Sequence, residues 1–423
     1  MVYVISKDGQ PLMPTNRSGK VRRLLRDKKA KVVKRCPFTI QLLYEATDFV
    51  QECTLGVDTG SKHCGAAVYS DGKILYQSQI ELRDDIKSKM ETKRKCRRFR
   101  RNRKTRYRKA RFLNRKNSTK LDRLPPSIRS KVNSQIKEIE FVKSILPISQ
   151  LVLEVGQFDT HLMKDPTINR HWGYQKGPNY GFENTKAKVL YRDNYECQCC
   201  KTKKGTLNVH HIIYRSKGGS DEESNLITLC ESCHTKLHQG KLKSFEEKLI
   251  GKEKADLRYA TQMSIVRSQL LKHYPEAIET FGYVTKANRQ QLGLPKDHYI
   301  DACVIASAGK PFTQNEVVFY KKCAAKQDRQ LTKGVRGEQS IITKKILGFK
   351  KFDKVEYFGG KYFIKGRMSS GYAILMDIFG TKVDFSNLPK GMKTPKLSNC
   401  KRITARSSVC ISQKIIPNIE NRY

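Results

Sequence analysis

Alternating apolar and polar positions predict strands at several places along the chain. Between residues 51 and 83, three short β-patterned runs are separated by glycine-rich and Asp-Gly turns, which is typical of a three-strand meander. The apolar run in ISQLVLEVGQFD predicts a buried strand that ends at Glu154, and residues 279–309 predict a strand followed by a helix. The pattern therefore predicts an α/β protein.

Other segments carry helical or mixed patterns. Helical patterns run up to about Ile145 and again over residues 245–274. The first fifty residues contain the sequence PLMP, a basic segment from Arg17 to Arg35 and an apolar end, so they predict a small α/β unit. Beyond residue 312, β-patterned runs with glycine turns predict a small β-barrel. The chain is thus expected to hold several domains.

Length and charge narrow the class of protein. A chain of 423 residues has room for about two to four domains. It carries 84 Lys and Arg against 40 Asp and Glu, a net charge of +44, which points to a polyanionic partner. The sequence contains no apolar run near the ~18 residues that a membrane span needs, and its first residues do not have the pattern of a signal peptide. Nucleic acid is the expected partner, in a reducing compartment.

The positive charge is densest between residues 87 and 116, which hold seventeen Lys and Arg and one acidic residue, Glu91. The run has no Pro or Gly, and Phe99, Tyr107 and Phe112 interleave with the arginines, as expected for a helix along a phosphate backbone. The alternative is a solvated tail. The arginines expected to bind nucleic acid are Arg94, Arg97, Arg98, Arg100, Arg101, Arg103, Arg106, Arg108 and Arg111.

Two Cys-x-x-Cys pairs indicate a metal site. Cys197 and Cys200 form one pair, and Cys230 and Cys233 form the other, so four thiolates can surround a structural Zn²⁺ ion. Cys199, beside Cys200, leaves open which thiols bind. The total of 13 cysteines is odd, which also favours thiols and zinc thiolates over a disulfide framework.

Two adjacent histidines lie between these cysteine pairs, in NVHHIIYRSKGGS. With an asparagine after a glycine turn and a histidine on the next helix, they can converge on a divalent ion beside a scissile phosphate; the alternative is second-sphere residues of a zinc ribbon. The order His-His, Asn, Cys-x-x-Cys-His resembles the HNH endonuclease family. The resemblance implies that His211 is the general base, that His210, His234 and His238 are Mg²⁺ ligands, and that Asn225 ligates the metal or orients the base.

A second set of residues lies outside this module. Asp58 and Glu154 each end a predicted strand, and His298 and Asp301, three residues apart, share one face of a helix. Three carboxylates at the ends of adjacent strands would bind two Mg²⁺ ions about 3.5–4 Å apart, with His298 as a base for phosphodiester hydrolysis. In this order they resemble the three split pieces of a RuvC-like nuclease of the RNase H fold, and the basic run then corresponds to a bridge helix.

Almost the full length resembles the IscB family of transposon-associated RNA-guided endonucleases. The resemblance implies an RNase H-like fold split in three, a bridge helix, an inserted ββα-metal HNH domain with a four-cysteine zinc site, and a C-terminal β-barrel that reads a target-adjacent motif and contacts RNA. The expected divisions are an N-terminal PLMP domain (1–50), RuvC-like part I (51–83), bridge helix (84–118), RuvC-like part II (119–165), linker (166–184), HNH domain (185–240), RuvC-like part III (241–311) and C-terminal β-domain (312–423).

The resemblance implies a monomeric ribonucleoprotein of the prokaryotic cytoplasm or nucleoid. A large structured guide RNA would pair with one strand of double-stranded DNA, the HNH site would cut that strand, and the RuvC-like site would cut the displaced strand. The expected cofactors are Mg²⁺, with Mn²⁺ as a substitute, and structural Zn²⁺. Two alternatives are an unguided HNH homing or intron endonuclease and a basic RNA-binding transposon accessory protein.

Overall fold

A computed structural model of the chain divides into two compact units, Met1–Gln157 with Gln262–Tyr423, and Phe158–Thr261. The structure describes residues 1–47, 49–101, 123–164, 174, 179–215, 219–250, 257–325, 330–331, 338–339, 346–389 and 391–416. The predicted nucleic-acid contacts Arg103, Arg106, Arg108 and Arg111 lie outside these residues.

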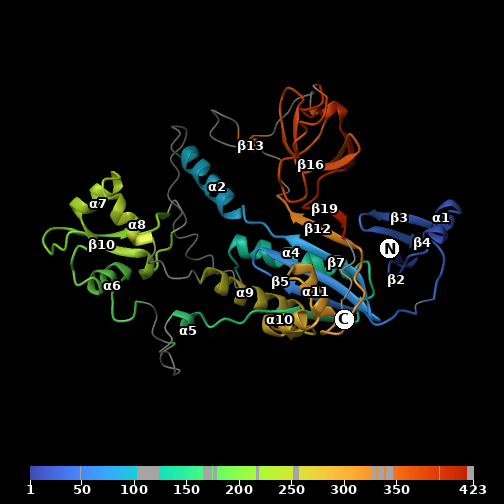
Figure 1. Cartoon of the computed structure of the whole chain (residues 1–423), viewed down its shortest axis with the longest axis horizontal. Helices are drawn as coiled ribbons and strands as arrows, with labels where there is room; N and C mark the ends of the chain where they lie inside the picture. Colours follow the sequence, from blue (N-terminus) through green and yellow to red (C-terminus); the bar gives the residue numbers. More distant parts are fainter. Residues whose placement is uncertain are drawn as a thin grey trace. The chain divides into compact units, whose positions relative to one another are not determined.

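A seven-stranded sheet is the centre of the larger unit, with the strand order β11-β8-β5-β6-β7-β12-β19 (Figure 1). Its strands are β5 (Thr54–Thr59), β6 (His63–Ser70), β7 (Lys73–Glu81), β8 (Gln150–Glu154), β11 (Ile278–Thr280), β12 (Val317–Cys323) and β19 (Val409–Ile415). The antiparallel neighbours β5, β6 and β7 confirm the predicted meander, and β8 lies parallel to β5. Segments far apart in sequence therefore meet in one sheet.

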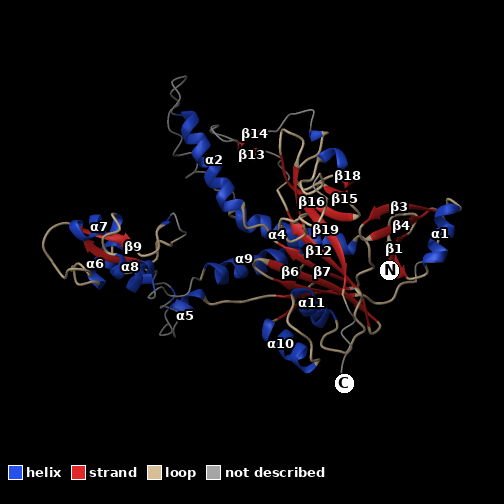
Figure 2. Cartoon of the chain, turned by 45° about the horizontal axis from the view of Figure 1, so that its top comes forward, coloured by secondary structure: helices blue, strands red, loops and turns tan. Residues whose placement is uncertain are grey.

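Helices cover both faces of this sheet (Figure 2). They are α4 (Pro126–Lys143), α9 (Arg258–His273), α10 (Gly282–Gln291) and α11 (His298–Ala306). Successive side chains of a strand point to opposite faces. On β6, Ala66 and Val68 pack in one core with Ile139 of α4, whereas Ala67 packs in another core with Ile300 of α11. Helices α4 and α11 therefore lie on opposite faces.

Two glycines allow α11 to lie close to the sheet. A Cβ atom at Gly65 would collide with the backbone carbonyl of His298, and one at Gly56 would collide with the backbone of Ala306. Because these neighbours are backbone atoms, they cannot rotate away as the end of a side chain can. Gly56 and Gly65 thus fix how closely α11, with His298 and Asp301, approaches β5 and β6.

We expect Gly65→Ala to lower the free energy of unfolding by about 1–3 kcal/mol, because the added methyl group forces α11 away from β6. Thermal unfolding measures the change. The matched control is Gly19→Ala in helix α1 (Ser18–Arg26), where a Cβ atom meets nothing within 4 Å. Equal melting temperatures for the two variants would contradict the close approach of α11.

Three smaller sheets complete the described part of the larger unit, one of them the short pair β13 (Gln330–Leu331) and β14 (Glu338–Gln339). The N-terminal sheet has the order β2-β1-β4-β3 and, with α1, confirms the predicted small α/β unit. Its strands are β1 (Val2–Ile5), β2 (Pro11–Thr15), β3 (Ala30–Arg35) and β4 (Phe38–Leu42). A four-stranded antiparallel sheet near the C-terminus contains β15 (Lys354–Tyr357), β16 (Gly360–Arg367), β17 (Ala373–Met376) and β18 (Lys401–Thr404). Within the described residues its end strands β17 and β18 are not paired, so the barrel stays a prediction.

The region 312–423 does not form one separate sheet. Strands β12 and β19, both within it, pair with each other, and β12 pairs with β7 of the meander. The first and last described strands of this region therefore extend the central sheet, while the division at residue 312 stays a prediction. The apolar β-pattern of this region predicted strands but could not show with which sheet each would pair.

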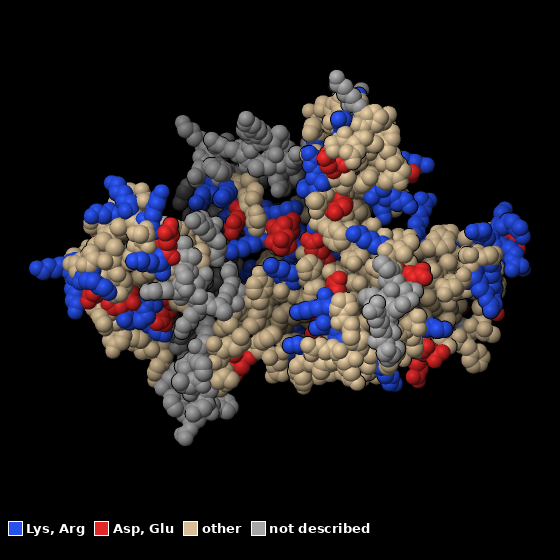
Figure 3. Space-filling view, in the orientation of Figure 1, with Lys and Arg blue, Asp and Glu red and all other residues tan. Residues whose placement is uncertain are grey.

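The basic run begins as helix α2 (Ile86–Arg101), which carries Arg94, Arg97, Arg98, Arg100 and Arg101. Lys and Arg side chains also gather at many places on the face of the molecule shown in Figure 3. Among the helices that the structure describes, none is long and apolar enough to cross a membrane. The charge of α2 and of this face agrees with a polyanionic partner.

The smaller unit is built around a short hairpin. Strands β9 (Leu207–His211) and β10 (Leu226–Cys230) are antiparallel, and α7 (Glu231–His238) follows β10 directly. Helices α5 (Thr160–Lys164), α6 (Thr185–Arg192) and α8 (Lys243–Ile250) complete its described elements. Its core contains Leu229 and Leu237 together with buried cysteines. The unit thus has the ββα arrangement expected for the segment that holds the histidines.

Candidate metal centres

The predicted carboxylates of the larger unit meet near the carboxyl ends of β5 and β8 in the central sheet. We call Asp58, Glu154, His298 and Asp301 the carboxylate centre. Asp58 of β5 lies directly beside Glu154 of β8 in the parallel register of the two strands. Helix α11 begins at His298, whose amide nitrogen donates to the side chain of Asp297 at the N-cap. The Nδ1 atom of His298 lies 2.6 Å from Oδ2 of Asp58. All four predicted residues are therefore brought to one place.

Burial and mutual repulsion dominate the electrostatics of this centre. Burial, followed by the charge of Asp58, raises the pKa of Glu154 to about 7. The same two causes raise the pKa of Asp301, whereas Arg289 opposes them. A hydrogen bond with Asp58 raises the pKa of His298. Clustered carboxylates of this kind are costly to ionise together without a cation.

The donor set fits a hard divalent cation. The Oε2 atom of Glu154 is buried and has no hydrogen-bond partner among the described residues. Carboxylate oxygens are the ligands that Mg²⁺ prefers. Asp58, Glu154 and Asp301 would hold the ion, so the prediction of Mg²⁺ is chemically consistent with this centre.

Sequence reasoning did not find Arg289. Its Nε atom, on α10, lies 2.7 Å from Oδ1 of Asp301, although the two groups are not aligned as a hydrogen bond. Both side chains are largely buried. No sequence signal pairs these residues, because their proximity depends on how α10 packs against α11.

The four predicted cysteines of the smaller unit cluster together. The Sγ atoms of Cys197, Cys200, Cys230 and Cys233 all lie within 4.8 Å of one another, whereas Cys199 is not part of the group. Although burial acts in the opposite direction, backbone hydrogen bonds from Cys200 and Cys230 lower the pKa of Cys197 to about 7, which favours a thiolate. The cluster could bind Zn²⁺, and the structure selects Cys200 over Cys199.

Three histidines form a second possible metal site, which we call the histidine centre. One ring nitrogen from each of His210, His234 and His238 lies within 4.8 Å of the others. Burial, then the charges of His234 and His238, lowers the pKa of His210 to about 4. Burial also lowers the pKa of His234. A neutral imidazole is the form that ligates metals.

His211, the next residue of strand β9, is not part of this cluster. Its Nε2 atom lies 2.8 Å from Oδ1 of Asp221, which also accepts a hydrogen bond from Arg215. Asp221 was not predicted, since it lies in the loop between β9 and β10 and its approach to His211 depends on the loop shape. The two adjacent histidines therefore have different environments.

Asn225 holds this loop in place. It is fully buried, its Oδ1 accepts from the backbone of Ile213, and its Nδ2 donates to the carbonyls of Ile213 and Ser220. The amide is thus occupied by backbone hydrogen bonds rather than placed among the three histidines. This geometry favours the orienting role over metal ligation.

Imidazole ligands suit first-row transition ions, whereas Mg²⁺ prefers oxygen. The histidine centre offers three imidazoles within ligand distance of one another. A transition ion that prefers imidazole, such as Zn²⁺, Fe²⁺ or Ni²⁺, therefore fits these three residues better than the predicted Mg²⁺. The carboxylate centre and the histidine centre have different donor chemistry.

Comparisons with known proteins agree with this geometry. The family of RRXRR proteins matches residues 2–177, and the HNH endonuclease family matches residues 197–240. A protein of Nostoc sp. called anaredoxin is 42% identical over 69 residues, which are 16% of this chain and 90% of that protein.

Solved structures of Cas9 enzymes are also similar. Two structures of Streptococcus thermophilus Cas9, bound to AGAA and AGGA PAM sequences, have TM-scores of 0.34 and 0.41 at 11% and 12% identity. They cover 57% and 71% of this chain, which spans 32% and 58% of the Cas9 chains. The Type II-C Cas9 of Actinomyces naeslundii has a TM-score of 0.18 at 16% identity, over 43% of this chain and 28% of that enzyme.

The two family matches fall on the parts of the chain that carry the metal centres. Asp58 and Glu154 lie within the RRXRR match, and the histidine centre and the four clustered cysteines lie within the HNH match. An HNH domain is a metal-dependent endonuclease module, so the protein is a nuclease. The chain therefore combines an RRXRR region with an HNH endonuclease region, a combination found in IscB/Cas9-like nucleases.

Proposed function

We propose that the protein is an RNA-guided DNA endonuclease with two hydrolytic centres. The observation that carries the proposal is the presence of a carboxylate centre and a histidine centre in two separate compact units of one strongly basic chain. A guide RNA pairs with one DNA strand, and the protein binds the hybrid through its shape and phosphates. The histidine centre cuts the paired strand, and the carboxylate centre cuts the displaced strand.

The larger unit supplies a RuvC-like centre of the RNase H type. Support comes from the sheet, in which an antiparallel meander continues into the parallel strands β8 and β11, and from the side-by-side Asp58 and Glu154. Bound Mg²⁺ would polarise the phosphate and stabilise the attacking and leaving oxygens. His298, held by Asp58, accepts the proton of the attacking water at its free Nε2 atom.

In the smaller unit, His211 is the general base. The hydrogen bond with Asp221 fixes the orientation of its ring, and Asn225 fixes the loop that presents Asp221. His210, His234 and His238 would hold a divalent ion at the scissile phosphate, and four thiolates would hold structural Zn²⁺. The domain divisions predicted from the sequence remain part of this proposal, with β12 and β19 of the region 312–423 in the central sheet.

The raised pKa of Glu154 predicts a pH-dependent metal requirement for the displaced strand. A cation binds the ionised carboxylate, so protons compete with the ion below pH about 7. Each further pH unit below that value lowers the affinity for the cation by up to about tenfold. The Mg²⁺ concentration for half-maximal cleavage of the displaced strand should therefore fall as pH rises from 6 to 8. Strand-resolved cleavage across a Mg²⁺ titration at each pH measures it.

The outcome that contradicts this prediction is a half-maximal Mg²⁺ concentration for the displaced strand that stays the same from pH 6 to pH 8, because Glu154 would then bind the ion without competition from protons.

Sequencing the RNA that copurifies with the protein tests guidance. We expect one structured noncoding RNA with discrete ends. Random degraded fragments would instead favour an unguided HNH endonuclease, which explains the histidine centre but leaves the carboxylate centre without a role.

A further inference from the structure

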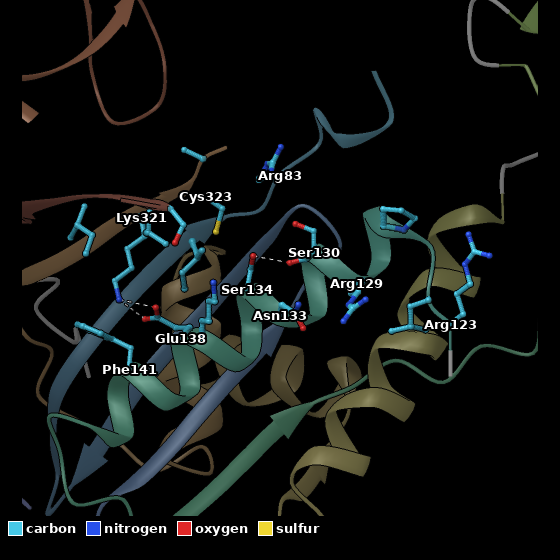
Figure 4. Close-up of a pocket in the computed structure, with 18 residues that line it drawn as sticks. Arg83, Arg123, Arg129, Ser130, Asn133, Ser134, Glu138, Phe141, Lys321 and Cys323 are labelled. Atoms are coloured by element: carbon cyan, nitrogen blue, oxygen red, sulfur yellow. Dashed lines mark hydrogen bonds and ion pairs between the residues drawn. The ribbon is translucent and has the colours of Figure 1, made fainter. Parts of the chain in front are cut away.

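A pocket with a volume of about 770 Å³ lies in the larger unit (Figure 4). One wall is the face of α4 that carries Ser130, Ser134, Glu138 and Phe141, which recur at helical spacing. The other walls come from β7, β12 and β19. None of the residues of the carboxylate centre lines this pocket, which is on the α4 face of the sheet.

Cations dominate its lining, which includes Arg83, Arg123, Arg129, Lys137 and Lys321 against the single carboxylate Glu138. That carboxylate is already satisfied, because it accepts hydrogen bonds from Lys321, Tyr76 and Ser78. Arg83 is paired with Asp85 at 2.8 Å. Arg123, Arg129 and Lys137 are exposed and have no acidic partner among the residues that the structure describes. The pocket therefore has uncompensated positive charge.

The remaining lining groups favour a sugar–phosphate backbone over a nucleobase. The ring of Phe141 is covered by two ammonium groups, those of Lys321 at 4.0 Å and Lys34 at 4.5 Å, so it does not offer a free stacking surface. Ser130 and Asn133 supply a hydroxyl and an amide beside the cations. Hydroxyl and amide groups can bond a ribose 2′-OH, while guanidinium and ammonium groups bind phosphate.

We propose that this pocket binds a short stretch of guide-RNA backbone without reading its bases. The inference rests on the proposed function, which supplies the RNA. Arg83 stands three residues before the start of α2 at Ile86, so RNA held here lies next to the beginning of the basic helix. The pocket and α2 thereby form one continuous phosphate-binding track.

The double variant Arg129→Gln with Lys137→Gln, in the full chain, tests the pocket. Both residues are exposed and unpaired, so the substitutions should leave thermal unfolding unchanged. Lys73→Gln with Lys310→Gln removes the same charge from exposed positions at the opposite end of β7 and after α11. The probes are a fluorescent 20-nucleotide oligouridylate and the oligothymidylate of equal length, with binding measured by anisotropy over a salt series.

For the Arg129→Gln, Lys137→Gln variant, we expect the slope of log affinity against log salt with oligouridylate to be about 1.4 smaller in magnitude than for the wild type. Each lost phosphate contact on a single strand contributes about 0.7 to this slope. The control variant should bind as the wild type does. Equal slopes for the two variants would overturn the assignment to a phosphate backbone. An equal loss of affinity for oligouridylate and oligothymidylate in a Ser130→Ala, Asn133→Ala variant would overturn the assignment to RNA. If the slopes are equal while guided cleavage persists, the pocket does not bind the RNA backbone and the proposed function stands. Absence of guided cleavage by the wild type would instead reject the proposed function.

Discussion

Asp58→Ala should convert a double-strand break into a nick in the guide-paired strand, and His211→Ala should leave the nick in the displaced strand. Asp58 is expected to ligate the ion and also holds His298 at 2.6 Å, so its loss removes two functions of the carboxylate centre. His211 is the proposed base of the histidine centre. Loss of a positioned acid or base costs about 10²–10⁴ in rate, which is sufficient to leave one strand intact.

Strand-specific end labels on a duplex target measure both products. Asp71→Ala, at an exposed turn between β6 and β7, is the matched control and should still cut both strands. If each variant nicks the strand expected of the other, the assignment of the two strands to the two centres is contradicted. Double-strand cleavage by both single variants would reject the division of labour itself.

Cys197→Ser should remove the bound zinc and abolish cleavage of the paired strand, while the displaced strand is still cut. The four Sγ atoms lie within 4.8 Å of one another beside the small core of the ββα unit, so a bound Zn²⁺ ion would join the loop before β9 to α7. A structural zinc ion can contribute about 10–16 kcal/mol to the folding of a small domain. The larger unit has its own cores and should remain folded.

Cys199→Ser is the control, because this neighbouring thiol lies outside the cluster. Elemental analysis of the purified variants gives the zinc content, and thermal unfolding separates the two units. Equal zinc loss in both variants would mean that Cys199 takes part in the site, and full zinc content in Cys197→Ser would exclude the four-cysteine arrangement.

The residues that sequence reasoning identified share one property, in that their positions follow from local pattern. Asp58 and Glu154 end apolar strands, and two parallel strands in register bring their ends together. The alternation of a strand also separates His210 from His211, so one enters the metal cluster and the other faces Asp221. Such relations require only the secondary structure and its periodicity.

What could not be predicted depends on tertiary packing. Arg289 reaches Asp301 because α10 folds back on α11, and Asp221 reaches His211 through the shape of a loop pinned by Asn225. Spacing alone also could not choose between Cys199 and Cys200. The return of β19 to the central sheet was missed for the same reason, since a strand pattern does not name its partner.

Cleavage with a reprogrammed guide tests the central claim most directly. The copurifying RNA is transcribed with a new guide segment and combined with RNA-free protein. The complex is then incubated with a plasmid that carries the original target and, separately, with a plasmid that carries the new target. We predict that cleavage moves to the new target and stops at the original one. Cleavage that stays at the original site, or that proceeds without RNA, would contradict an RNA-guided nuclease.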